Sequence, residues 1–200
     1  MMRVSKAIFI PLLLLLCAAC ADKGESPFIR LALQTEPSTL DPAFSVDYSS
    51  GMISSLLHAN LVRYTPDGEL VPDVAESWEI SGDATEYTFH LGAARFSCGR
   101  PVEAADVLFS FERLLDPETI SPRWWVLEPV SGADSFHRGL SRSLPGIEAP
   151  DDSTLIIRLE RPAAHFLGLL AMPAAGIVCR EEASSSGDGY GRSPCGSGPW

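Results

Sequence analysis

Residues 95–117 read RFSCGRPVEAADVLFSFERLLDP, and this stretch decides the fold class of the chain around it. From residue 104 its apolar side chains recur at the spacing of a helix with one buried face: Ala104, Val107, Leu108, Phe111, Leu114 and Leu115. Pro101 precedes this helix and Asp116-Pro117 closes it, as helix start and stop signals do. We expect the three phenylalanines of the stretch to fill a core rather than to bind a ligand.

The sequence on either side of this helix alternates strands with further helices. A helix is expected over residues 49–60, and strands over residues 28–34, 61–64, 78–80, 86–91, 143–148 and 154–159. Leu155, Ile157 and Leu159 lie on one face of the last of these strands. Regular βαβ units are not visible, so the pattern predicts an α+β fold.

Several motifs resemble, in the same order, those of the family 5 solute-binding proteins of ABC transporters, the oligopeptide- and dipeptide-binding group. Residues 95–117 are similar to a family segment with Asp at the position of Cys98 and Thr at that of Glu103. Further similar runs are TEPSTLDP at residues 35–42, LVRYTPDGELVPDVAESW at residues 61–78 and GSGPW at residues 196–200. The resemblance covers about residues 28–200, which makes it more specific than any one motif.

The resemblance implies a mixed α/β fold of the periplasmic-binding-protein-like II type. Residues 28–47 are then expected to form the first segment of lobe I, residues 48–170 a small α+β domain, and residues 171–200 a return into lobe I. The second lobe would follow Trp200. We therefore expect the chain to be a fragment or a truncated product without that lobe.

The same resemblance implies a monomeric receptor that captures peptides and delivers them to ABC permease subunits, with no cofactor. The ligand-facing positions would fall near Val46 and Tyr48, and an aromatic residue facing the peptide would be Trp124 or Trp125. Alternatively, Tyr48 forms the first turn of a helix and the tryptophan pair packs in a surface loop. Receptors for nickel, haem or an oligosaccharide, a truncated structural envelope lipoprotein and an exported hydrolase are the other functional interpretations.

The N-terminus has the features of an export signal. Arg3 and Lys6 form a positive segment, residues 7–16 are apolar, and Cys17-Ala-Ala-Cys20 follows. The last residues resemble a lipobox, although Cys17 stands where Leu is usual. We expect residues 1–19 to be a lipoprotein signal peptide, Cys20 to be acylated and residues 20–27 to form a tether. The protein would then be extracytoplasmic and anchored to a membrane by lipid; full secretion after cleavage is the alternative.

The charge and the absence of catalytic motifs exclude other classes. Removing Arg3 and Lys6 leaves 13 of 15 basic residues against 26 acidic ones, a formal charge of −13. Such a chain is not suited to nucleic acid. The four histidines show no paired metal-ligand spacing, and no Gly-x-Ser-x-Gly elbow or phosphate loop occurs. We therefore expect a binding protein and not an enzyme.

Three cysteines remain beyond the leader: Cys98, Cys179 and Cys195. A disulfide between Cys179 and Cys195 would close a short Gly/Ser-rich loop and stabilise the fold by about 3 kcal/mol. Free thiols are the alternative, since spacing alone does not establish the geometry of a bridge. Cys98 would be buried in its turn or pair with a cysteine in the missing half of the protein. A metal site from residues so scattered in sequence is the least favoured interpretation, so no metal is expected.

Overall fold

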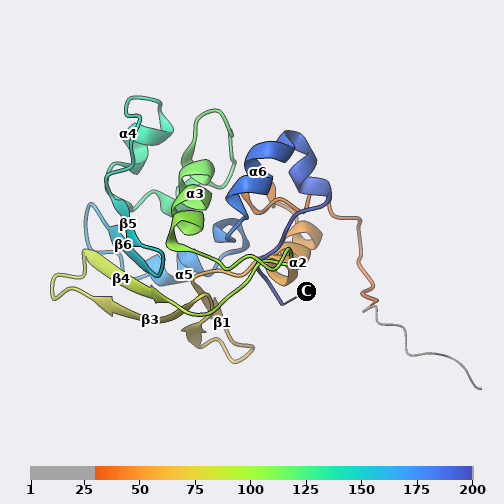
Figure 1. Ribbon diagram of the computed structural model, residues 1–200, viewed down its shortest axis with the longest axis horizontal. Helices are drawn as coiled ribbons and strands as arrows, with labels where there is room; N and C mark the ends of the chain where they lie inside the picture. Colours follow the sequence, from red (N-terminus) through yellow and green to blue (C-terminus); the bar gives the residue numbers. More distant parts are fainter. Residues whose placement is uncertain (1–29, 200) are drawn as a thin grey trace, which may run out of the picture. The chain divides into compact units, whose positions relative to one another are not determined.

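The computed structural model describes residues 30–199 (Figure 1). The predicted signal peptide, the acylated Cys20 and the tether lie outside these residues. One compact unit begins at Gln34 and contains every helix and strand of the described chain. Among the helices of residues 30–199, none has the length and apolar composition needed to cross a bilayer.

A four-stranded antiparallel sheet confirms the predicted α+β class. In spatial order its strands are β3 (Ala75–Ile80), β4 (Glu86–Leu91), β6 (Thr154–Arg158) and β5 (Ile147–Asp151). Phe89 on β4 pairs with Leu155 on β6, and Tyr87 pairs with Ile157. All four of these side chains are buried because alternate residues of a strand point to the same face.

The remaining elements are helices, short 3-10 helices and one further pair of strands. In chain order they are η1 (Pro42–Phe44), α2 (Tyr48–Leu57), β1 (Val62–Tyr64), β2 (Leu70–Pro72), α3 (Ala104–Leu115), η2 (Trp124–Leu127), α4 (Ala133–His137), α5 (Phe166–Leu170), η3 (Pro173–Ala175), α6 (Arg180–Ser186) and η4 (Gly187–Arg192). The strands β1 and β2 form a separate antiparallel hairpin.

Helix α3 has the bounds that the apolar spacing predicts, and it packs against β5 and β6 (Figure 1). Its start is capped although Glu103 stands where the resembling family has Thr. The carboxylate of Asp106, three residues further on, accepts a hydrogen bond from the Glu103 amide at 2.9 Å. Phe96 and Phe111 are buried as expected, and Phe109 packs against a smaller apolar cluster around Tyr190.

The strand predicted over residues 143–148 is displaced in the structure. It begins at Ile147 and continues through Pro150 to Asp151, beyond the predicted end. β5 is an edge strand of the sheet, and its pairing with β6 shifts between Glu148 and Asp151. Proline lacks an amide donor, but an edge strand with an irregular register accommodates it.

Two further predicted elements differ from the observed structure. The described part of the predicted strand 28–34, residues 30–34, is not a strand. Apolar alternation alone does not make a strand, because a strand also needs a paired neighbour for its hydrogen bonds. The helix predicted over residues 49–60 ends at Leu57, since the next residues pair elsewhere: the Ile177 amide donates to the Ala59 carbonyl at 2.9 Å.

A buried ion pair joins the loop before η1 to helix α3. Arg113 Nη1 donates to Asp41 Oδ1 at 2.9 Å, and a second contact joins Nη2 to Oδ2. Asp41 is 3% exposed, and the Arg113 guanidinium also lies over the ring of Tyr190. This pair holds the early loop against α3 across 72 residues of sequence.

His58, directly after α2, provides a pH-dependent element of stability. Its ring is buried and its Nε2 lies 3.1 Å from the Leu40 carbonyl oxygen. Burial lowers the pKa of His58 below its ordinary value of 6.5, with the hydrogen bond to Leu40 opposing that effect. The unfolded chain therefore takes up the proton first as the pH falls.

We expect the free energy of unfolding to fall as the pH drops below about 6.5, by up to roughly 1.4 kcal/mol per pH unit from His58 alone. Urea unfolding at pH 7.5, 6.5 and 5.5 measures this slope. In His58→Gln the slope should decrease by that amount, whereas His165→Gln, which changes an exposed ring, should keep the wild-type slope. Equal slopes in all three proteins would contradict the prediction.

Candidate functional site

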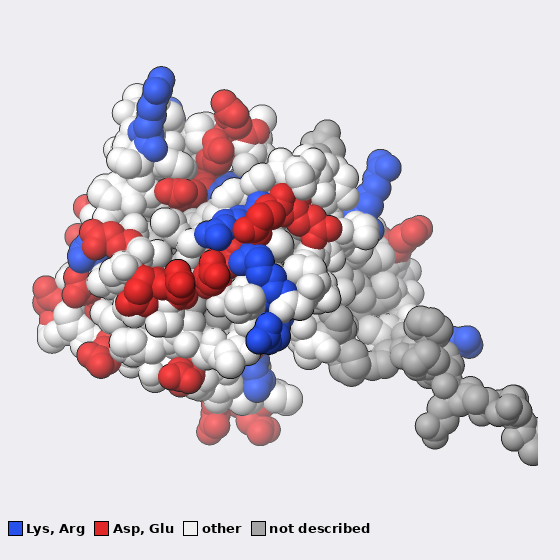
Figure 2. Space-filling model, viewed as in Figure 1, with Lys and Arg blue, Asp and Glu red and all other residues white. Residues whose placement is uncertain are grey.

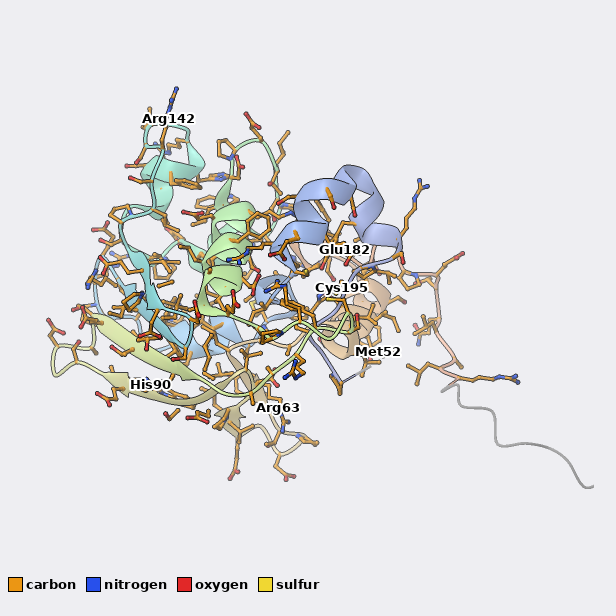
Figure 3. The ribbon with its side chains drawn as sticks, viewed as in Figure 1. Met52, Arg63, His90, Arg142, Glu182 and Cys195 are labelled. Carbon is orange, nitrogen blue, oxygen red and sulfur yellow. The ribbon has the colours of Figure 1, made fainter. Side chains whose placement is uncertain are left out.

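Two adjoining surface hollows meet at the start of α2, and we call them together the Tyr48 groove. One of about 190 Å³ is lined by Ser45, Val46, Asp47, Tyr48, Gly51, Arg123, Met172, Pro173 and Ala174. The other, of about 480 Å³, is lined by Tyr48, Gly51, Met52, Ser55, Leu56 and Pro173. Because both include Tyr48, Gly51 and Pro173, they form one continuous surface. Figure 3 labels Met52 on α2, within this surface.

Tyr48 owes its position to a strong N-terminal cap on α2. The Asp47 carboxylate accepts hydrogen bonds from the Ser50 amide at 2.8 Å, the Ser50 hydroxyl at 2.6 Å and the Ser38 hydroxyl at 2.7 Å. The hydrogen bonds from Ser50, and then that from Ser38, hold the pKa of Asp47 well below its usual range. The first turn of α2 is therefore fixed, and it presents Tyr48 to solvent with 79% of its surface exposed.

The loop that carries Val46 is held by the segment before η2. Arg123 donates from Nη2 to the Val46 carbonyl at 3.1 Å and from Nε to the Ser45 carbonyl at 3.3 Å. The Ser121 hydroxyl donates to the Ala43 carbonyl at 2.6 Å. Val46 itself is exposed, so a rigid loop carries an apolar side chain into solvent beside Tyr48. Exposed apolar surface on fixed backbone is suited to ligand contact.

The tryptophan pair occupies a different place from Val46 and Tyr48. Trp124 stacks on His137 with ring centroids 4.2 Å apart, and His137 Nδ1 lies 2.9 Å from the Leu115 carbonyl oxygen. Trp125 is partly exposed, but neither tryptophan lines the Tyr48 groove. The structure thus brings two of the four predicted ligand-facing residues together and leaves the tryptophans outside the groove lining.

Sequence reasoning missed other residues of the groove. Arg123 directly precedes the two tryptophans. A positive charge next to two aromatic residues was the local signal that could have indicated Arg123 as a groove residue. Met172 and Pro173 come from a segment more than a hundred residues after Tyr48, and no local pattern in them points to a surface at α2. Their position follows from tertiary packing: Asn60 Nδ2 donates to the Leu170 carbonyl at 2.8 Å and to the Met172 carbonyl at 2.7 Å.

The three cysteines beyond the leader lie together in a second location. Cys98, Cys179 and Cys195 are unbridged in the structure, and their sulfur atoms are all within 4.8 Å of one another. The sequence predicted proximity only for Cys179 and Cys195, and their bridge stays a prediction. Cys98 joins them because the Ser97 amide donates to the Gly196 carbonyl at 2.8 Å.

Comparison with protein families identifies one match over most of the chain. The model of the bacterial extracellular solute-binding proteins, family 5 Middle, matches residues 69–200. This range runs from the β1–β2 connection through helix α3 to the Gly-Ser-Gly-Pro segment near the end.

Two of the curated relatives have names that describe peptide binding. The periplasmic murein peptide-binding protein MppA of Escherichia coli is 36% identical over 145 residues, covering 70% of this chain and 26% of that protein. Di/tripeptide-binding protein 2 of Pseudomonas aeruginosa is 32% identical over 218 residues, covering 100% of this chain and 40% of that protein. The chain thus spans between about a quarter and two fifths of the length of these relatives.

Solved structures show the same fold. The substrate-binding domain of an oligopeptide ABC transporter from Bacillus anthracis superposes with a TM-score of 0.81 at 31% identity, over 84% of this chain and 34% of that one. The unliganded open form of MppA gives a TM-score of 0.77 at 33% identity, over 83% of this chain and 33% of that one. The mixed arrangement of helices and sheets described above is therefore part of a periplasmic-binding-protein fold.

Proposed function

Because the chain belongs to the bacterial extracellular solute-binding proteins of family 5, we propose that it serves as the substrate-binding component of an ABC transporter. In this role the protein captures peptides outside the cytoplasmic membrane and delivers them to the permease. The peptide-binding names of its relatives support peptides as the solute. The Tyr48 groove carries the proposal, because it displays Val46 and Tyr48, the two residues for which the family resemblance implies contact with the ligand.

The groove suggests how a peptide would be held on this side. Tyr48, Met52 and Pro173 offer apolar surface to a peptide side chain, while the fixed backbone around Val46 offers hydrogen-bonding groups to an extended main chain. Recognition through main-chain groups tolerates many side chains, so this half of the site would favour extended peptides over one sequence. Closure of a second lobe over the ligand would complete the site.

The other features of the proposed receptor follow from the same role. We propose export by residues 1–19, anchoring through Cys20, residues 20–27 as a tether, and action as a monomer beside the permease, without enzymatic activity. Residues 28–47 and 171–200 would belong to lobe I, and residues 48–170 would form its small α+β domain. These assignments rest on the sequence and on the relative MppA, whose name describes a periplasmic protein.

Thermal-shift screening of the full-length protein against mixed dipeptides and oligopeptides tests the function. A peptide present at 100 times its dissociation constant should stabilise the native state by about 2.7 kcal/mol and raise the melting temperature accordingly. Nickel, haem and an oligosaccharide mixture serve as parallel arms. Stabilisation by one of these and by no peptide would contradict the peptide proposal.

Tyr48→Ala tests the groove itself. We expect peptide affinity to fall about 30-fold, equivalent to about 2 kcal/mol for the loss of an aromatic anchor. The melting temperature without peptide should change little, because the side chain is exposed. Tyr64→Ala is the matched control, since Tyr64 is an exposed tyrosine outside the groove. If calorimetric titration gives both variants the wild-type affinity, the groove is not the peptide site.

A further inference from the structure

Three segments far apart in sequence bring one cysteine each to the same place. Cys98 lies in the turn before α3, Cys179 immediately precedes α6, and Cys195 follows η4. Their sulfur atoms are within 4.8 Å of one another, with Cys179 and Cys195 buried and Cys98 exposed. In Figure 3 Cys195 is labelled in the middle of the molecule below α6. The group of three cysteines therefore reaches the surface at one residue and is buried at the other two.

The backbone around these cysteines is fixed. The turn of Cys98 is closed by a hydrogen bond from the Phe96 amide to the Arg100 carbonyl at 2.9 Å, and Gly99 supplies the positive φ of 87° that the turn requires. The Ser97 amide donates to the Gly196 carbonyl at 2.8 Å, which ties this turn to the segment of Cys195. The sulfur positions thus follow from the fold and not from flexible side chains alone.

Polar donors point at two of the sulfur atoms. Arg100 Nη2 lies 3.5 Å from the Cys179 sulfur, and the Ser97 hydroxyl lies 3.6 Å from the Cys195 sulfur. Arg100 is itself held by two hydrogen bonds, of 2.9 Å and 2.6 Å, to the buried carboxylate of Asp106. Hydrogen bonds to sulfur stabilise a thiolate, which is the form that binds metals, while the Cys179 thiol in turn donates to Glu181 Oε2 at 3.4 Å.

The charges around the sulfur atoms are nearly balanced. Arg100 and Arg180 contact the carboxylates of Asp106, Glu103 and Glu181. Figure 2 shows acidic and basic side chains interleaved in the middle of the face it draws. The carboxylates exceed the guanidinium groups by one. A divalent cation bound to three thiolates would neutralise two of their three negative charges and add only one negative charge to this surface.

We propose that Cys98, Cys179 and Cys195 form a three-thiolate binding site for a thiophilic divalent metal ion of the Zn²⁺ type. Zn–S bonds of about 2.3 Å in a tetrahedral site separate the sulfur atoms by about 3.8 Å. The observed spacing needs a contraction of no more than about 1 Å to reach this value. Each thiol releases its proton to solvent as the metal binds, and the exposed side of Cys98 leaves the fourth position to water.

A disulfide explains the arrangement less completely. A bridge joins two sulfur atoms, and it gives no reason for the third to lie within the same 4.8 Å. It would also remove two of the three metal ligands. The metal and the bridge therefore exclude each other, and a count of free thiols distinguishes them.

The test uses the protein with Cys17→Ser and Cys20→Ser, which removes the other two thiols of the sequence. The protein is first reduced with a phosphine and freed of metals. Titration with Co²⁺ should then produce thiolate-to-cobalt charge-transfer absorption that saturates at one equivalent of Co²⁺. Adding Zn²⁺ should displace the Co²⁺ and abolish this absorption. Each of Cys98→Ser, Cys179→Ser and Cys195→Ser should lower Zn²⁺ affinity by about 100-fold or more. Ser185→Ala, on an exposed part of α6, should keep the affinity.

Circular dichroism confirms that each variant is folded before its affinity is interpreted. Absence of Zn²⁺ binding by the folded, reduced protein would overturn the proposal. So would binding that survives all three cysteine replacements, or the loss of two of three reactive thiols in protein isolated without reductant. A peptide-binding result for the Tyr48 groove bears on none of these outcomes, so this proposal and the proposed function fail independently.

Discussion

Arg113→Met is expected to lower the free energy of unfolding by about 3–5 kcal/mol, because it leaves the buried carboxylate of Asp41 without its partner. Methionine keeps much of the apolar stem of arginine, so the loss is mainly that of charge and hydrogen bonds. Asp41 would keep the hydrogen bond from the Ala43 amide at 3.0 Å, which does not neutralise it. Urea unfolding followed by circular dichroism gives the midpoint and slope that measure the change.

A matched control separates the effect of losing a buried ion pair from the effect of losing an exposed one. Arg138 pairs with Asp134 at 2.9 Å, but both side chains are more than half exposed. Arg138→Met should therefore change the free energy of unfolding by less than about 1 kcal/mol. Combining Asp41→Asn with Arg113→Met should restore part of the loss, because no unpaired charge remains. Equal effects of the two arginine replacements would show that the buried pair has no special energetic role.

The Arg113–Asp41 pair also links helix α3, which does not line the Tyr48 groove, to the loop that forms part of the groove. Asp41 precedes η1, and the loop after η1 carries Val46 into the groove. Helix α3 anchors the start of this loop through Arg113, and Arg123 anchors its end. Residues 95–117, one of the segments that resemble the family, thus support the proposed ligand surface without contributing to its lining.

Local signals in the sequence predicted the elements whose structure depends on local interactions. Helix α3 has the predicted bounds because its apolar period and its Asp-Pro end are contained in one segment. β4 also matches the expected range, since its apolar side chains alternate over six residues. β5 does not, because its register depends on pairing with β6 at the edge of the sheet, which the sequence near Pro150 does not reveal.

The candidate sites depend on contacts between residues far apart in sequence, which no local sequence pattern predicts. Arg113 meets Asp41 across 72 residues, and Arg100 meets Cys179 across 79. Spacing arguments treat cysteines so distant in sequence as unrelated, which is why the sequence analysis considered a bridge only between Cys179 and Cys195 and placed Cys98 apart. Val46 and Tyr48 were predicted as ligand-facing because the family resemblance, and not their own chemistry, indicated their positions.

The Gly-Ser-Gly-Pro segment at residues 196–199 contacts several distant parts of the fold. The Gly198 amide donates to the Leu57 carbonyl at 2.8 Å, at the end of α2. The Ser197 hydroxyl donates to the Ile177 carbonyl at 2.8 Å and accepts from the Ala59 amide at 3.0 Å. Such close backbone approach requires residues without side chains at both glycine positions.

Gly196→Ala is therefore expected to destabilise the protein by about 3 kcal/mol, the upper end of the usual range for overpacking. A Cβ atom at this position would lie 2.0 Å from the Leu57 carbonyl oxygen, which is backbone and cannot move aside alone. Gly82→Ala is the control, because a Cβ there meets nothing within 4 Å. Urea unfolding should show a large shift of midpoint for the first variant and almost none for the second. A shift of similar size in both would mean that the segment adjusts freely, and that neither the end of α2 nor the position of Cys195 depends on its close packing.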